Sequence, residues 1–127
     1  MGAVVKTFFS LAAVLTSVLG VLWLFFPQAM LGAFGAPQPD AIAVYMARRY
    51  GALFFGYAAT LWLGRASASS PALKAILGGG VVVSVVICIV SLVGVLFTGV
   101  VGPAVWGAGV VEALLAALFI YYYARAR

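Results

Sequence analysis

Histidine and asparagine are absent from this sequence, and Cys88 is its only cysteine. Without imidazole or paired thiols, the chain lacks the usual protein ligands of zinc and haem and cannot form an internal disulfide. Acidic residues are nearly absent too, since Asp40 and Glu112 are the only two. Few groups remain for acid–base or nucleophilic chemistry. We therefore expect no metal, no cofactor and no enzymatic activity.

Charge of either sign is also scarce. Charged residues make up 7% and hydrophobic residues 67% of the 127 residues, whereas ordinary globular domains are about a quarter charged and roughly half apolar. Such a chain cannot cover itself with a water-facing surface. We expect an all-α integral membrane protein, with residues 1–127 in a single domain.

Four long apolar stretches run along the chain, separated by proline, glycine and charged residues. Each is close to the about 20 residues that a helix needs to cross roughly 30 Å of hydrocarbon. The expected helices cover residues 7–26, 41–64, 75–97 and 104–123. The sequence therefore predicts a four-helix transmembrane bundle with an up-down topology.

The basic residues predict the orientation of this bundle, because Lys and Arg near the ends of spans are retained in the cytoplasm. In a four-span arrangement, one side holds Lys6, Arg65, Lys74, Arg125 and Arg127. We expect a multi-pass protein of the bacterial inner membrane with both termini in the cytoplasm. The net charge of +5 is then explained by topology and anionic lipid, so no nucleic acid is expected as a partner.

Small residues recur at helical spacing in every stretch, and helices in lipid pack through such residues. We expect these faces to pack inside the bundle, with some serving a partner chain. A glycine triplet, Gly78 to Gly80, marks either a kink, a close crossing or the start of a helix. The expected packing face of the second stretch consists of Ala52, Gly56, Ala59 and Thr60, and that of the third of Gly80, Ser84, Cys88 and Ser91.

The connection between the first two stretches is apolar and contains three prolines. Its residues Met30, Leu31 and Phe34 predict one turn lying in the membrane interface on the non-cytoplasmic side. Docking of this segment against a neighbouring protein is the alternative.

Arg48 and Arg49 interrupt the second stretch, which needs a start before them to be long enough for a bilayer. Asp40 is the expected N-cap of that helix. Arg48 lies eight residues beyond Asp40, and Glu112 lies eight residues into the fourth stretch, which predicts similar depths in the membrane. We expect an intramembrane ion pair between Arg49 and Glu112, with Arg48 beside it. This pair either locks two helices in register or forms a proton-sensitive or anion-binding site. The remaining alternative is that both arginines extend to the membrane surface and Glu112 pairs with another chain.

Two functions fit these features. The first is a non-catalytic membrane protein, either an accessory or structural subunit of a larger membrane complex or a homo-oligomer, with membrane lipids as further partners. The alternative is a minimal transporter or proton-sensitive channel that works through the Arg–Glu pair.

Three features resemble the uncharacterised four-span bacterial membrane proteins of DoxX-like proportions. They are the Phe-Phe-Pro stop at residues 25–27, the Arg-Arg-Tyr-Gly step at residues 48–51, and an apolar last helix with one glutamate, Glu112. The resemblance covers most of the chain and implies a bundle in the bacterial inner membrane. It implies no activity.

Overall fold

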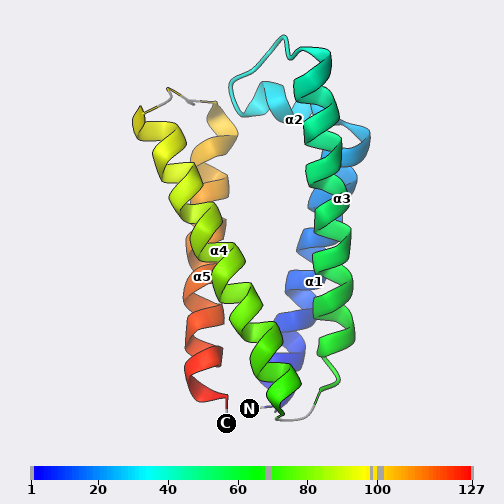
Figure 1. The fold of residues 1–127 in the computed structure, drawn as a ribbon, viewed down its shortest axis with the longest axis vertical. Helices are drawn as coiled ribbons and strands as arrows, with labels where there is room; N and C mark the ends of the chain where they lie inside the picture. The colour runs from blue at the N-terminus through cyan, green and yellow to red at the C-terminus, as the bar shows by residue number, and fades with distance from the viewer. Residues whose placement is uncertain (1, 68–69, 98, 100–101, 127) are drawn as a thin grey trace. The chain divides into compact units, whose positions relative to one another are not determined.

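The computed structural model describes residues 2–67, 70–97, 99 and 102–126, and these residues contain five α-helices (Figure 1). The all-α class is therefore confirmed. In chain order the helices are α1 (Gly2–Phe25), α2 (Pro27–Ala33), α3 (Ala41–Gly64), α4 (Pro71–Phe97) and α5 (Pro103–Arg125).

The prediction of a four-helix transmembrane bundle is wrong. Of the five helices in the described residues, three (α1, α4 and α5) are long and apolar enough to cross a membrane, which is compatible with a membrane protein. α3 has the predicted bounds, but Arg48 and Arg49 reduce its hydropathy. Each charged side chain costs about 2.5 to 3.5 kcal/mol near the centre of a bilayer. α2 has seven residues and is too short to span.

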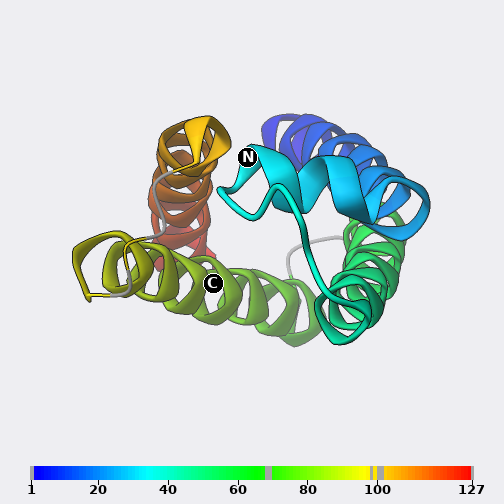
Figure 2. The same ribbon diagram turned by 90° about the horizontal axis from the view of Figure 1, so that it is seen from above.

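The chain divides into two compact units, Met1–Ser67 and Ala68–Arg127, which we call the first and second units. The first unit contains α1, α2 and α3, and α3 runs antiparallel beside α1 (Figures 1 and 2). The second unit consists of the antiparallel pair α4 and α5. The assignment of residues 1–127 to a single domain stays a prediction.

α1 and α3 approach most closely at two glycines that face each other. A Cβ atom on Gly51 would lie 2.8 Å from the backbone nitrogen of Leu24 and 3.0 Å from the carbonyl oxygen of Gly20. A Cβ atom on Gly20 would in turn lie 3.2 Å from the carbonyl oxygen of Gly51. Glycine at position 51 lets the two backbones touch, and glycine at position 20 leaves room for the carbonyl group of Gly51, as in close helix crossings within membranes.

α2 closes one end of this pair. Pro27 occupies its first turn, where the missing N–H costs no hydrogen bond, and Gly35 ends it with a φ of 104° that only glycine adopts readily. Phe34 then packs on Trp23 of α1 at 5.5 Å between ring centroids, and Trp23 packs on Tyr50 of α3 at 5.4 Å. The segment expected to form one turn is thus a two-turn helix held against α1 and α3.

α4 begins at Pro71, four residues before the expected Ala75, because Ser70 precedes a proline at the first helical position. The backbone N–H of Leu73 donates a hydrogen bond of 3.2 Å to Ser70 Oγ, which caps the helix. The glycine triplet lies inside α4. Gly80 lies where α4 and α5 cross closely, since a Cβ atom at this position would overlap the ring of Phe119 in α5.

Candidate functional site

Asp40 is the N-cap of α3, where the sequence places it. Its Oδ1 accepts a hydrogen bond of 2.7 Å from the backbone N–H of Ala43, and its own backbone is extended. This cap satisfies one N–H of the first turn and fixes where the helix starts. It thereby sets the positions of Arg48 and Arg49, two turns further along α3.

Both arginines are exposed, and Arg49 has a partner on its own helix. Its Nη1 donates a hydrogen bond of 3.2 Å to the hydroxyl oxygen of Tyr45, and the guanidinium carbon lies 5.7 Å from the centre of the tyrosine ring. Tyr45 and Arg49 are four residues apart and therefore neighbours on one face. The tyrosine holds the guanidinium group near the helix surface.

The face of α3 that packs against α1 differs from the expected one. Its buried residues are Ala47, Gly51, Ala58, Leu61 and Gly64. The expected packing residues Ala52, Gly56, Ala59 and Thr60 are exposed instead. With 3.6 residues per turn, Gly56 and Arg49 point away from the face that carries Gly51. The prediction of internal packing through this set, which we call the outer small face, is therefore wrong for the first unit.

Glu112 lies in the second unit and has a partner across the α4–α5 pair. Ser91 Oγ of α4 donates a hydrogen bond of 2.7 Å to Glu112 Oε2 of α5. Both residues are half-buried. The expected packing face of α4 is confirmed at Gly80 and Ser91, which contact α5. The hydroxyl gives the carboxyl group a donor inside two candidate spans, where a charged group without one is costly.

The structure thus places Arg49 and Glu112 each beside a neighbour in its own unit. Arg49 belongs to the first unit and Glu112 to the second. The ion pair between them, with Arg48 beside it, stays a prediction.

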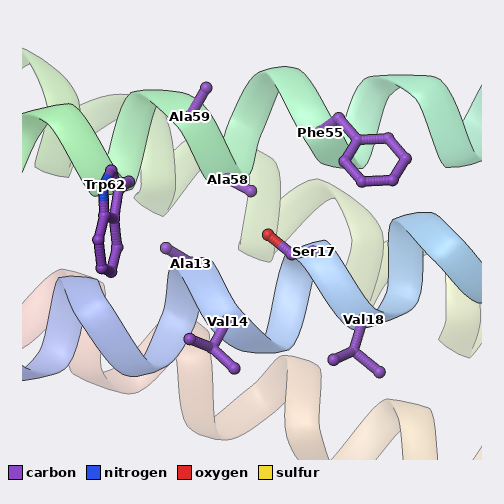
Figure 3. Close-up of a pocket in the computed structure, with 8 residues that line it drawn as sticks. All are labelled: Ala13, Val14, Ser17, Val18, Phe55, Ala58, Ala59 and Trp62. Atoms are coloured by element: carbon purple, nitrogen blue, oxygen red, sulfur yellow. The ribbon is translucent and has the colours of Figure 1, made fainter.

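A groove runs along one side of the α1–α3 pair and has a volume of about 480 Å³ (Figure 3). From α1 it is lined by Ala13, Val14, Ser17 and Val18. From α3 it is lined by Phe55, Ala58, Ala59 and Trp62. Ser17 and Trp62 reach into the space between the two helices in Figure 3. We call this hollow the α1–α3 groove.

One end of the α1–α3 groove carries a cation. The guanidinium carbon of Arg65, the residue after α3, lies 3.4 Å from the centre of the Trp62 ring. Arg65 Nη1 also donates a hydrogen bond to the backbone carbonyl of Trp62. The contact is a cation–π interaction in which the indole wall of the groove orients the charge.

Sequence reasoning did not single out Gly51, Trp62 or Arg65 as a functional set. A signal for Gly51 exists, since positions 47, 51, 54, 58 and 61 repeat at intervals of three and four residues. Trp62 and Arg65 are three residues apart, which places them side by side on a helix surface. No sequence signal predicts that a groove lies beside them.

The described residues contain no group of three or more His, Cys, Asp or Glu side chains that could hold a metal ion. Cys88 is half-buried with its thiol free. Among the described residues, the polar contacts of the expected and newly found site residues include the Ser91–Glu112 pair, the Tyr45–Arg49 pair and the Arg65 cation beside the groove.

No curated protein and no solved structure matches this chain. One family model matches it over residues 1–124, nearly its whole length. The chain therefore belongs to the family described as "Domain of unknown function (DUF8292)".

Proposed function

We propose that this protein is a non-catalytic integral membrane protein of the bacterial inner membrane. It acts as an accessory or structural subunit that associates with a larger membrane complex or with a second copy of itself. The resemblance to membrane proteins of DoxX-like proportions is part of this proposal and adds no activity to it.

The basic residues support an orientation for each unit separately. In the first unit, Lys6 near the start of α1 and Arg65 after α3 lie at the same end of the antiparallel pair. In the second unit, the Lys74 ammonium group lies 5.7 Å from the ring centre of Tyr123, two residues before Arg125. We assign both basic ends, and with them both termini, to the cytoplasmic side.

The outer small face of α3 is the observation that carries the proposal. A Cβ atom added to Gly56 would meet nothing within 4 Å. Small residues in membrane helices let a second backbone approach closely, which is how such helices associate without a hydrophobic driving force. Arg49 continues this face, and an exposed guanidinium group there favours a neighbour that offers an acceptor. A partner helix that carries a polar residue would pack on the outer small face and offer an acceptor to Arg49.

Gly56→Leu is the test of this proposal. The leucine side chain would cover the outer small face and keep a partner helix away, while the fold of the first unit stays unchanged because nothing lies against Gly56. We expect the protein purified in mild detergent to lose its partner or to change from an oligomer to a monomer. Size-exclusion chromatography with light scattering, and mass spectrometry of co-purifying chains, measure this.

The matched control is Gly79→Leu, at a second exposed glycine whose added Cβ would also meet nothing within 4 Å. It is expected to leave the association unchanged. A wild-type protein that migrates as a lone monomer with no co-purifying chain contradicts the proposal.

A minimal transporter or proton-sensitive channel is the second candidate, favoured by the hydrogen bond between Ser91 and Glu112. An acidic side chain within candidate spans often marks a pathway for protons or ions. The non-catalytic proposal predicts that liposomes with wild-type protein take up protons no faster than empty liposomes, and that Glu112→Gln changes nothing. Gln keeps the shape and the acceptor oxygen but cannot release a proton. Proton uptake by the wild type that Glu112→Gln abolishes would instead support the transporter.

A further inference from the structure

The α1–α3 groove is apolar along its length and open on its outer side. Its floor is made of small side chains, among them the buried Ala13 and Ala58. These side chains let the two helices approach closely but are too small to fill the space beside the helix contact. Its walls stay partly uncovered, with Val14 57% and Trp62 46% exposed. In a helix pair that includes a candidate span, such a hollow faces hydrocarbon, so its occupant must be slender and apolar.

The two ends of the groove differ in polarity. Phe55 and Val18 form one end, and Trp62 with the Arg65 guanidinium group forms the other. Phe55 and Arg65 are ten residues apart on a helix, or about 15 Å at 1.5 Å per residue. Lys6 lies at this same basic end, about two α1 turns before Ala13, the first residue of α1 that lines the groove. A cation at one end of an apolar channel complements an amphiphile with an anionic head.

We propose that the α1–α3 groove holds one acyl chain of an anionic phospholipid, whose phosphate is bound by Arg65. A guanidinium group presents five N–H donors, of which the backbone carbonyl of Trp62 takes one. The remaining N–H donors of the planar guanidinium group can bind two oxygens of a phosphate, and stacking on Trp62 holds the guanidinium group in place. The basic end lies on the side where anionic lipids attract Lys and Arg.

This site shares Ala59 with the outer small face, but the residues that test the two sites differ. Gly56 does not line the groove, and Arg65 lies beyond the end of α3, so Gly56→Leu and the Arg65 variants each change one site and leave the other intact. Failure of the lipid site and failure of the subunit proposal are therefore distinguishable.

The test uses the full chain in mild detergent with equal amounts of phosphatidylglycerol and phosphatidylcholine that carry the same acyl chains. Native mass spectrometry counts the lipids that each protein retains. The wild type is expected to retain one phosphatidylglycerol in preference to phosphatidylcholine. Arg65→Gln is expected to lower retention of phosphatidylglycerol about tenfold, since charge-assisted hydrogen bonds contribute at least that factor. Arg65→Lys keeps the charge but lacks the planar pair of N–H donors, so its retention of phosphatidylglycerol is expected to lie between those of the wild type and Arg65→Gln.

Two groove variants and one control complete the experiment. Ser17→Leu places a larger side chain on the floor of the groove, and Val18→Trp places one on its wall. Each variant is expected to retain less of both lipids, while its helical content by circular dichroism stays that of the wild type. Arg125→Gln is the matched control, because Arg125 stacks on Tyr121 at 4.2 Å within the second unit and is not among the residues that line the groove. It is expected to change nothing.

Equal retention of phosphatidylglycerol by the wild type and Arg65→Gln would overturn the proposal. So would a change from dimer to monomer in Ser17→Leu without a change in bound lipid, because the occupant would then be a second copy of the chain.

Discussion

Replacing Gly51 with alanine is expected to lower the free energy of unfolding of the protein by about 2 kcal/mol. The new Cβ atom would lie 2.8 Å from the backbone nitrogen of Leu24 and 3.0 Å from the carbonyl carbon of Trp23. Both are backbone atoms, so no side-chain rotation relieves the overlap and α1 must move away from α3. Alanine favours a helix over glycine by about 1 kcal/mol, which offsets only part of this loss.

Gly56→Ala is the matched control, five residues along the same helix. Its Cβ atom would meet nothing within 4 Å, so we expect no loss of stability and a gain of up to about 1 kcal/mol from helix propensity. Unfolding by sodium dodecyl sulfate from mild detergent, followed by circular dichroism, compares the two variants. Equal midpoints for Gly51→Ala and Gly56→Ala would show that the helices do not cross at Gly51.

Local features of the fold could be predicted from the sequence. The bounds 41–64 expected for α3 agree with the structure, because Asp40 supplies the cap and Gly64 precedes a charged residue. A cap and an apolar length depend on neighbours in the sequence, which the sequence displays directly. The start of α4 was missed for the converse reason, since Ser70 and Pro71 form a cap that hydropathy does not register.

The face of α3 that meets α1 could not be chosen from the sequence by the rule that small residues pack inside. The chain has 15 glycines, and small residues occur on both sides of α3. The side that packs combines Gly51 with Leu61, whereas the side left outside carries Gly56 and Thr60. Only the position of α1 decides between them, because close approach needs a glycine on both helices.

For the candidate site, the sequence predicts that charged residues need partners, but contacts between helices again depend on how the helices pack. Glu112 and Arg49 were expected to need partners because charge is costly in lipid, and the structure gives each a partner in its own unit. Tyr45 lies four residues before Arg49, so that contact was readable as a helix pair. The Ser91–Glu112 bond joins two helices and depends on their register, which depth counting alone does not fix.

Replacing Gly80 with alanine is the second change for which we expect a large loss, again about 2 kcal/mol of the free energy of unfolding. The new Cβ atom would overlap the fully buried ring of Phe119, lying 2.8 Å from Cγ and closer still to Cδ1 and Cε1. Gly79→Ala is the control, because its Cβ atom would meet nothing within 4 Å and the sequence environment is the same. Unfolding in detergent is expected to separate the two variants clearly.

The atoms that would clash with residue 80 belong to a side chain, and this distinguishes Gly80 from Gly51. Phe119→Leu removes ring carbons that the new Cβ atom would overlap, so the Gly80→Ala, Phe119→Leu double variant is expected to be more stable than the sum of the single changes. We expect an interaction energy of about 1 to 2 kcal/mol from the double-mutant cycle. Additive effects, or a Gly80→Ala variant as stable as Gly79→Ala, would mean that α4 and α5 do not cross at this residue. No side-chain substitution is expected to rescue Gly51→Ala in the same way, because there the backbone itself is the obstacle.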